Sequence, residues 1–398
     1  MAILSVNAGS SSLKFSLHPL QGGEVQSQVL SGNAQGLEPG GSPAMDWKYR
    51  GEKRQETLAV PAGGSAFGAA LERLHALIGQ LDGAPAIQAV SHRVVHGGGV
   101  FTTSVLVTDD VLTQLARFNS LAPLHQKHNL EGIRRFRAAF PKLPQVACFD
   151  TAFHAGMPEI NYAFALPHDL REQGVRRYGF HGLSYQYIMS VLQAQTPRGK
   201  GRVIMAHLGN GSSLCAAREG RSVATTMGFS ALDGLMMGTR SGALDPGVLL
   251  YLLEQGWTHD RIETLLYKQS GLLGVSSISA DMRTLRADGD QADAQRAIDQ
   301  FTHRAVCEMG AMAACLDGLD VLAFSGGIGE NDAVLRQQVC ERLGWMGVRI
   351  DAQRNREATG QAASPVHTPD SKIEVWVIAT DEGRVAAREA AALLPMKQ

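Results

Sequence analysis

The chain of 398 residues lacks any run of about 18 consecutive apolar residues, the length that a membrane-spanning helix needs. Its N-terminus, MAILSVNAGSSSLKF, also lacks the basic region and long apolar segment of a signal peptide. From these two absences we expect a soluble protein of the cytoplasm.

Cysteine is scarce and shows no regular pairing. The five cysteines never form a C-x-x-C motif, and they lie at positions 148, 215, 307, 315 and 340. A disulfide framework or a zinc ribbon would need pairs at regular spacing. We therefore expect reduced thiols.

An excess of one charge is missing as well. Lys and Arg number 37 and Asp and Glu 38, so the formal net charge is −1. This balance argues against nucleic acid or an anionic membrane as the main partner. It leaves room for a local phosphate pocket, because such a pocket needs only two or three well-placed cations.

The common nucleotide-binding motifs are absent, since the chain contains neither G-x-x-x-x-G-K-[ST] nor a G-x-G-x-x-G after a strand. Instead, loops of small residues follow three predicted strands, at residues 7–12, 209–213 and 326–329. Without bulky side chains, consecutive backbone N–H groups can converge on an anion. One such loop alone is more typical of a hairpin turn, but three of them favour phosphate binding.

The length predicts two domains, and the hydrophobic pattern predicts an α/β fold. We predict helices over residues 66–81, 111–118, 129–140, 246–254, 260–267, 290–315 and 384–394. We predict strands over residues 2–6, 13–17, 47–49, 87–95, 145–149, 203–208, 321–324 and 373–378. The strand–loop–strand unit at the N-terminus recurs at residues 203–216, which predicts two similarly built halves with ligands at the strand ends.

Two acidic residues follow predicted strands directly. Asp150 comes after strand 145–149, and Glu382 follows the segment 373–380. Because Mg²⁺ needs only one or two carboxylates beside a triphosphate, these residues and Asn7 are candidate ligands. A helix N-cap is the alternative role for either carboxylate.

Two arginines stand in unusual places. Arg93 lies among apolar residues of a predicted strand, and Arg240 lies in the small-residue loop 238–242. The planar guanidinium suits phosphate and carboxylate oxygens, although a structural salt bridge is the alternative. His181 and His207 stand beside glycine-rich segments, where each could equally be an ordinary hydrogen-bonding residue.

Eight motifs, in this order, resemble those of the acetate and propionate kinases. They are NAGSSSLK (7–14), HRVVHGG (92–98), LAPLH (121–125), FDTAFH (149–154), YGFHG (178–182), HLGNGSS (207–213), MGTRSG (237–242) and GIGEN (327–331). The resemblance extends from residue 3 to about residue 390. It implies the duplicated actin-like ATPase fold that sugar kinases, Hsc70-type ATPases and actin share.

The resemblance also implies an arrangement of domains. Residues 1–150 would form an N-terminal domain on the acyl-substrate and phosphate side, joined by the C-terminal helix 384–398. Residues 151–383 would form the nucleotide-binding domain, with ATP in a cleft between the two. A homodimer in solution is implied as well.

The family's residue roles carry over to matching positions. The resemblance implies catalytic roles for Asp150, Arg93, His181 and Arg240, and metal binding by Asn7, Glu382 and Asp150. It implies nucleotide contacts at Lys14, His207, Leu208, Gly209, Asn210, Gly211, Asp281, Met282, Arg283, Gly327, Ile328, Gly329, Glu330 and Asn331. It implies an acyl-substrate site at Arg93, Val95, Leu121, Phe180 and Ala231. The cofactors would be ATP or ADP and Mg²⁺, which Mn²⁺ can replace.

The implied reaction is the reversible phosphorylation of acetate to acetyl phosphate by direct in-line transfer. A carboxylate is already ionised at neutral pH, so catalysis would depend on positioning and on cations rather than on a strong base. Ala231 replaces a proline that is frequent in acetate kinases, and this replacement keeps propionate kinase as the alternative. An actin-like nucleotide-binding scaffold is the rival from another class, although a scaffold has no need of two cations for a second substrate. A phosphatase of the same fold would be shown by ATP loss without any added acid.

Overall fold

The computed structural model describes residues 1–122, 125–288 and 291–394. The chain divides into two compact units. Unit 1 comprises Met1–Ala152 and the C-terminal segment from Asp381, and unit 2 comprises Phe153–Thr380. The sequence placed these divisions after residues 150 and 383. Among the described residues, no helix combines the length and the apolar character that crossing a membrane requires.

The sheet of unit 1 is mixed. Its central strands are β1 (Ala2–Ala8), β2 (Ser12–Gln21), β4 (Leu30–Gln35), β7 (Ile87–Val94) and β9 (Gln145–Phe149), in the order β4-β2-β1-β7-β9. Strands β5 (Ala44–Tyr49) and β6 (Glu52–Thr57) extend one edge, and β8 (Val105–Leu106) extends the other. The short β3 (Glu24–Val25) pairs with β2. Strand β1 is antiparallel to β2 and parallel to β7, and β7 is parallel to β9.

The sheet of unit 2 repeats this plan. Its strands are β10 (Arg202–Leu208), β11 (Ser212–Arg218), β12 (Arg221–Thr225), β13 (Val321–Ser325), β14 (Ser364–Pro365) and β15 (Glu374–Val377). Their order is β12-β11-β10-β13-β15-β14. Strand β10 is antiparallel to β11 and parallel to β13, as β1 is to β2 and β7. The five central strands of each unit therefore match in order and direction, which agrees with the predicted duplication.

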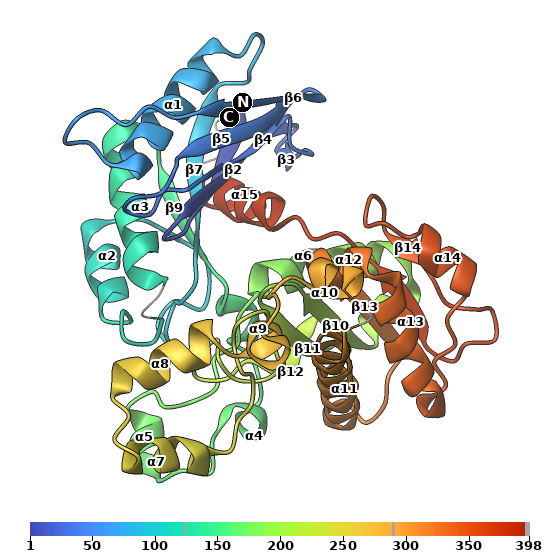
Figure 1. The fold of residues 1–398 in the computed structure, drawn as a ribbon. Helices are drawn as coiled ribbons and strands as arrows, with labels where there is room; N and C mark the ends of the chain where they lie inside the picture. The colour runs from blue at the N-terminus through green and yellow to red at the C-terminus, as the bar shows by residue number, and fades with distance from the viewer. Residues whose placement is uncertain (123–124, 289–290, 395–398) are drawn as a thin grey trace. The chain divides into compact units, whose positions relative to one another are not determined.

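Helices cover both faces of the unit 1 sheet (Figure 1). They are α1 (Ala66–Gln80), α2 (Asp109–Ala116), α3 (Gln126–Ala139) and α15 (Glu382–Leu393). Leu4 and Val6 of β1 share an apolar core with α1 and α3. Ser5 points to the opposite face, because side chains alternate along a strand, and its hydroxyl donates to the carbonyl of Gly383 in α15 (2.7 Å). Helix α15 thus closes the face opposite the main core.

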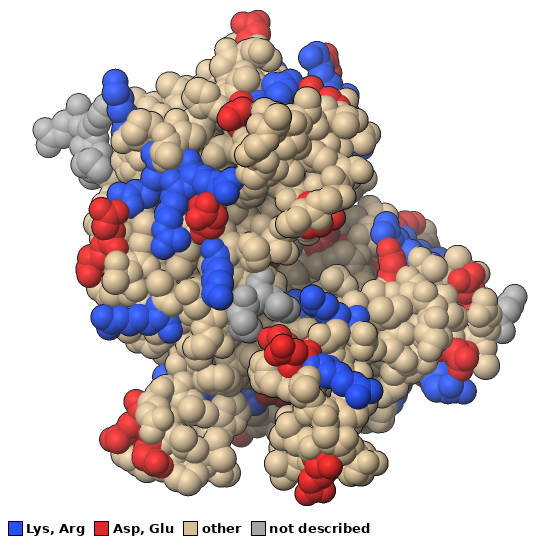
Figure 2. All heavy atoms as spheres, turned by 60° about the vertical axis from the view of Figure 1, so that its left-hand side comes forward, with Lys and Arg blue, Asp and Glu red and all other residues tan. Residues whose placement is uncertain are grey.

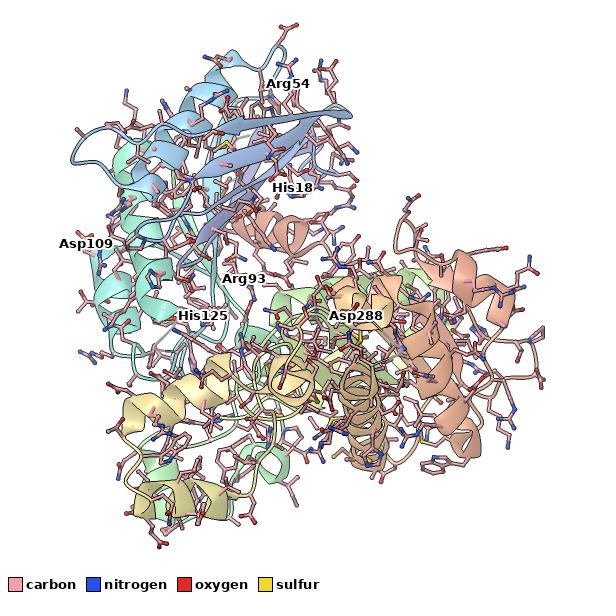
Figure 3. The ribbon with its side chains drawn as sticks, in the orientation of Figure 1. His18, Arg54, Arg93, Asp109, His125 and Asp288 are labelled. Atoms are coloured by element: carbon pink, nitrogen blue, oxygen red, sulfur yellow. The ribbon has the colours of Figure 1, made fainter. Side chains whose placement is uncertain are left out.

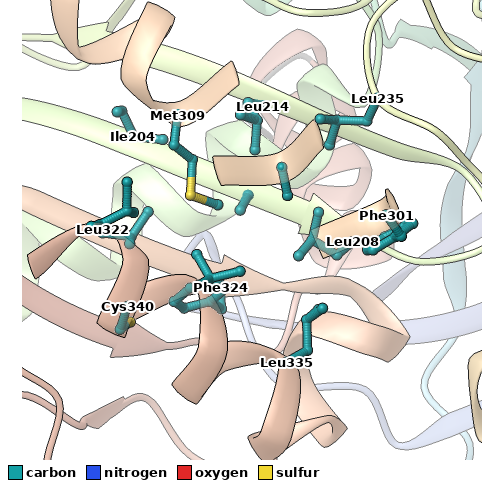
Figure 4. Packing of buried hydrophobic residues seen from close by; sticks show 14 of the residues in the cluster. Ile204, Leu208, Leu214, Leu235, Phe301, Met309, Leu322, Phe324, Leu335 and Cys340 are labelled. Carbon is teal, nitrogen blue, oxygen red and sulfur yellow. The ribbon is translucent and has the colours of Figure 1, made fainter. Parts of the chain in front are cut away.

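The sheet of unit 2 is also buried on both faces. Side chains such as Ile204, Leu322 and Phe324 pack with the long helix α11 (Ala292–Cys315), as Figure 4 shows. The alternate residues of the same strands pack against α6 (Gly182–Gln195). Strands β10 and β13 are near-continuous apolar runs because neither face of the sheet meets water.

The remaining helices of unit 2 are short. They are α4 (Glu159–Tyr162), α5 (His168–Glu172), α7 (Pro246–Glu254), α8 (His259–Lys268), α9 (Gly271–Ser276), α10 (Met282–Ala287), α12 (Gly326–Asn331), α13 (Ala333–Arg342) and α14 (Ala352–Glu357). The 3-10 turns are η1 (Ala152–His154), η2 (Pro197–Lys200) and η3 (Gly344–Met346). On the face shown in Figure 2, basic and acidic side chains lie among uncharged surface, as the near-zero net charge predicts.

The predicted loops were too long. Residues 326–329 are helical, because Gly326 turns the chain with φ of +76° directly from β13 into α12. Asn7 and Ala8 belong to β1, and Ser12 belongs to β2. Ser212 and Ser213 likewise belong to β11.

Helix α6 and the short helices from α9 to α14, apart from α11, were not predicted. Of the predicted segments, Pro123, Leu124, Asp290 and residues 395–398 lie outside the described residues.

Three buried histidines should make the stability depend on pH. Burial lowers the pKa of His92, His96 and His154 to about 4. An unfolded chain, with a histidine pKa near 6.5, binds more protons between these values, so stability falls as pH drops from about 6.5 to about 4. Each group contributes up to about 1.4 kcal/mol per pH unit.

Urea unfolding at pH 7.5 and at pH 5 measures this effect. We expect a lower midpoint at pH 5, and a smaller difference in His92→Gln because glutamine does not titrate. Equal midpoints for the unmodified chain at both pH values would contradict the prediction.

Candidate active site

Unit 1 contributes a buried ion-pair cluster. The Arg93 guanidinium donates through Nε and Nη2 to both carboxylate oxygens of Asp150, at 2.7 to 3.1 Å. Arg93 Nε also lies 3.5 Å from the Glu382 carboxylate. Burial opposes the charge on Arg93, but Asp150 and Glu382 outweigh burial and raise its pKa. Asp150 is only 1% exposed. Arg93 is therefore a permanent cation held between two acids.

The strand order brings these three residues together. Arg93 of β7 pairs in register with Cys148 of the parallel strand β9, and Asp150 follows two residues later on the same face. Helix α15 starts at Glu382 on this face, where Ser5 holds its first turn. Arg93 thus lies at the carboxyl end of the parallel strands (Figure 3), the edge where α/β sheets bind ligands.

Asn7 stands on the same face of the sheet. It lies two residues after Ser5 in β1 and opposite Lys14 of β2. Its amide oxygen and the Glu382 carboxylate are hard oxygens of the kind that Mg²⁺ prefers. Both oxygens of Asp150, in contrast, accept hydrogen bonds from Arg93. Among the described residues no three His, Cys, Asp or Glu side chains form a group that could hold a metal ion.

Unit 2 contributes a pair of stacked histidines. The rings of His181, at the start of α6, and His207, at the end of β10, lie 4.2 Å apart between centroids. His181 Nδ1 lies 2.9 Å from the Ser213 hydroxyl, and His207 Nδ1 lies 2.8 Å from the Ser184 hydroxyl. His207 and Ser213 face each other across the β10–β11 ladder, so the hydroxyl that contacts His181 lies on the strand beside His207, whereas Ser184 comes from α6. Each ring is therefore oriented through its Nδ1 atom.

The loop that carries Arg240 is fixed mainly through its backbone. The Leu272 N–H donates to the Met237 carbonyl (2.8 Å), and the Gly238 N–H donates to the Asn210 carbonyl (3.0 Å). Gly271, with φ of +64°, must be glycine because a Cβ there would lie 2.2 Å from the Met237 oxygen. Arg240 Nη1 donates to the Ala231 carbonyl (3.2 Å). The guanidinium is thus held in a defined position.

Arg240 and His181 meet beside the glycine loop. A methyl group at Gly211 would lie 3.4 Å from His181 Nε2 and 3.8 Å from Arg240 Nη1. Two nitrogens that can donate hydrogen bonds therefore flank the loop at Gly211. Such a cluster can stabilise negative charge that develops on phosphoryl oxygens.

The predicted nucleotide contacts lie partly next to this loop. A methyl group at Gly209 would lie 3.8 Å from the Gly327 nitrogen, so the loop adjoins α12. Asp281 caps α10 and binds Arg283 (2.6 Å), whose side chain is exposed. Leu208 and Met282 have buried side chains, so only their backbones could contact a ligand.

Glu330 is turned inward. Its carboxylate accepts hydrogen bonds from the Gly326 N–H (2.9 Å) and from the Thr380 N–H (3.2 Å). Burial raises its pKa, although these hydrogen bonds oppose the increase. The side chain therefore ties the end of β13 to the segment that follows β15.

The predicted acyl-site residues divide between the units. Val95 and Leu121 belong to unit 1 and are partly buried, whereas Phe180 and Ala231 belong to unit 2. Phe180 is fully buried, and Ala231 is half-buried.

Several residues that support the histidines were not predicted. They are Ser184, Tyr185 and Ser222, whereas Ser213, whose hydroxyl bonds that of Tyr185, was predicted only as part of the phosphate-binding loop 209–213. The available signal was spacing, because Ser184 and Tyr185 lie three and four residues after His181, one turn along a helix. The signal was weak because α6 buries apolar and polar residues together.

Comparison with known proteins agrees with this geometry. The profile described as the Acetokinase family matches residues 2–388. The chain belongs to the Acetokinase family. It is 48% identical to an acetate kinase of Rhodopseudomonas palustris over 392 residues, covering 97% of this chain and 96% of the relative. It is 44% identical to an acetate kinase of Methylocella silvestris over 407 residues, covering 98% of each.

Solved structures show the same fold. A propionate kinase of Francisella tularensis superimposes with a TM-score of 0.89 at 36% identity, covering 98% of both chains. The acetate kinase of Porphyromonas gingivalis gives a TM-score of 0.87 at 35% identity, covering 99% of this chain and 100% of that one. The predicted family, the duplicated ATPase fold and the phosphotransferase class are therefore confirmed.

Proposed function

We propose that this chain catalyses the reversible transfer of the γ-phosphoryl group of ATP to acetate, giving acetyl phosphate and ADP by direct in-line transfer. The observation that carries the proposal is the pairing of His181 Nε2 with Arg240 Nη1 beside the Gly211 loop. The similarity to an acetate kinase and to a propionate kinase supports a carboxylate as the group that accepts the phosphoryl group.

Each candidate residue of the two units has a role in this proposal. Arg240 and His181 stabilise the charge on the transferring phosphoryl group, and Arg93 orients the acetate carboxylate. Asp150 holds Arg93 in place and does not need to accept a proton, since acetate is already ionised. The segment His207–Gly211 faces the nucleotide phosphates, with Lys14, Asp281–Arg283 and Gly327–Asn331 as further nucleotide contacts.

A magnesium ion would be held by Asn7 and Glu382. The chemistry that it supplies is neutralisation of phosphate charge. Asp150 is assigned to the alignment of Arg93 rather than to direct metal contact, because both its oxygens accept hydrogen bonds from Arg93. Mn²⁺, which also accepts oxygen ligands, would substitute.

The decisive assay incubates the protein with Mg-ATP and acetate, propionate or butyrate, and traps acyl phosphate with hydroxylamine. Hydroxamate that forms only when an acid is present supports the proposal, and the acid with the highest kcat/KM identifies the preferred substrate. ADP release that is indifferent to every acid would instead favour a phosphatase or a nucleotide-driven scaffold.

Ala231 should relax the preference for acetate. Its carbonyl accepts from Arg240, and proline at this position keeps that carbonyl while adding apolar volume. We expect Ala231→Pro to raise the ratio of kcat/KM for acetate over propionate by about tenfold, within the range for one methylene group. Ala231→Gly, which adds no apolar volume, serves as the control. An unchanged ratio in Ala231→Pro would sink the hypothesis.

We also propose that the chain forms a homodimer through α7. Although this helix is mostly apolar, Leu250, Tyr251 and Leu253 are 63%, 59% and 53% exposed. Exposed apolar surface of this kind is typical of an interface.

Sedimentation should show a dimer for the unmodified chain and a monomer for Leu250→Glu with Leu253→Glu. Trp345→Glu, a change at a separate exposed apolar residue, should remain dimeric, and a dimer that survives the double change would exclude α7.

A further inference from the structure

His154 is a buried histidine with no role in the proposed chemistry. It ends the turn η1 after β9 and is 0% exposed. Its Nε2 lies 3.0 Å from the carbonyl oxygen of Phe180, and its Nδ1 lies 2.8 Å from the hydroxyl of Ser222 in β12. The Phe180 carbonyl belongs to the peptide unit that leads directly into His181.

The two partners determine which nitrogen of His154 carries the proton. Burial lowers the pKa of His154 to about 4, so the ring is neutral at pH 7 and has one donor and one acceptor nitrogen. A carbonyl oxygen can only accept, so Nε2 carries the hydrogen and donates to Phe180. Nδ1 then accepts from the Ser222 hydroxyl.

The turn that His154 supports has an unfavourable backbone. His181 adopts a left-handed conformation, with φ of 57° and ψ of 23°, which costs a non-glycine residue on the order of 1 kcal/mol. Gly179, with φ of +77°, lies directly against the ring, because a Cβ there would be 2.6 Å from His154 Cδ2. The segment 178–181 is thus folded over the ring of His154.

A second route connects His154 to the side chain of His181. The His154 ring packs edge-on against Tyr185, with centroids 5.7 Å apart and planes at 75°. The Tyr185 hydroxyl bonds Ser213, and the Ser213 hydroxyl lies 2.9 Å from His181 Nδ1. The backbone route and the side-chain route both end at His181.

We propose that His154 is a positioning residue: its hydrogen bond to the Phe180 carbonyl holds the left-handed turn and directs His181 Nε2 toward the Gly211 loop. This inference rests on the proposed function, in which His181 acts on the transferring phosphoryl group. His154 itself does not touch substrate, because its ring is buried and both nitrogens have partners inside unit 2.

A double-mutant cycle with His181→Ala tests the proposal. His154→Phe keeps an aromatic ring but removes both nitrogens, and should lower kcat about tenfold or more with KM values for ATP and acetate changed less than about threefold. In the His181→Ala background, the same change should lower kcat by less than about twofold, because the residue through which it acts is gone. An equal fold-change in both backgrounds would overturn the proposal.

Two further variants separate positioning from folding. His154→Gln can still donate an N–H to the Phe180 carbonyl, so it should recover most of the turnover lost in His154→Phe and should fold if His154→Phe does not. His92→Phe is the matched control, since His92 is equally buried but bonds Gln145 in unit 1. Its effect on kcat should be the same with and without His181.

The failure of this inference differs from failure of the proposed function. If His181→Ala alone leaves kcat unchanged, the proposed role of His181 is wrong and the coupling to His154 is wrong with it. If His181→Ala lowers kcat strongly but His154→Gln loses as much turnover as His154→Phe, only the positioning role is rejected.

Discussion

Replacing Arg240 by alanine should lower kcat by about a thousandfold while changing the KM for ATP less than about threefold. The guanidinium donates to the Ala231 carbonyl and lies beside Gly211, where the proposed function places the charge that develops on the phosphoryl oxygens. An interaction that forms mainly in the transition state affects turnover more than ground-state binding. Steady-state kinetics with Mg-ATP and acetate measure both constants.

Two control variants separate the charge of Arg240 from its shape and its position. Arg240→Lys keeps the charge but loses the planar fork, so it should recover only part of kcat. Arg261→Ala removes an arginine of unit 2 that stacks on Trp257, and should leave turnover unchanged. If Arg240→Ala raises KM as much as it lowers kcat, Arg240 binds the ground state instead.

Replacing Arg93 by alanine should abolish most activity and also destabilise unit 1 by about 3–5 kcal/mol. The reason is Asp150, which is almost fully buried and would lose the cation that donates hydrogen bonds to both its oxygens. The expected loss of activity follows from the role that we propose for the Arg93 guanidinium, which is to orient the acetate carboxylate. Urea unfolding measures the first effect, and acid-dependent hydroxamate formation measures the second.

Two comparisons make the Arg93 prediction specific. Adding Asp150→Asn to Arg93→Ala should restore part of the stability but none of the activity, because it removes the uncompensated charge only. Arg73→Ala breaks a partly exposed ion pair with Glu56 in the same unit, and should cost less than about 1 kcal/mol with normal turnover. Similar stability losses for Arg93→Ala and Arg73→Ala would contradict the burial argument.

Local patterns were sufficient for most of the central strands and for the helices α1, α7 and α11, but not for α6 or for the strands β4, β6 and β12. Strand β9 and helix α7 begin and end at the predicted residues, since a short apolar run and a Pro-initiated apolar segment are unambiguous. Helix α12 was predicted as a loop because its residues, Gly326 to Asn331, have low helix propensity. The start of α12 is fixed by the close contact between Gly326 and the backbone of Leu208 in β10, a residue far away in the sequence.

The sequence by itself determined the chemical inventory: two arginines, Asp150, Glu382, two histidines and the glycine loops that adjoin them, each at the end of a recognisable strand or in a small-residue loop. Only the tertiary structure decided their partners. That Asp150 binds Arg93 through both oxygens, and that His154 supports His181, follows from parallel strand pairing and from a turn folded over a buried ring. These two hydrogen bonds join residues 26 and 57 positions apart, and no local pattern specifies them, because they depend on how the strands order themselves when the core is buried.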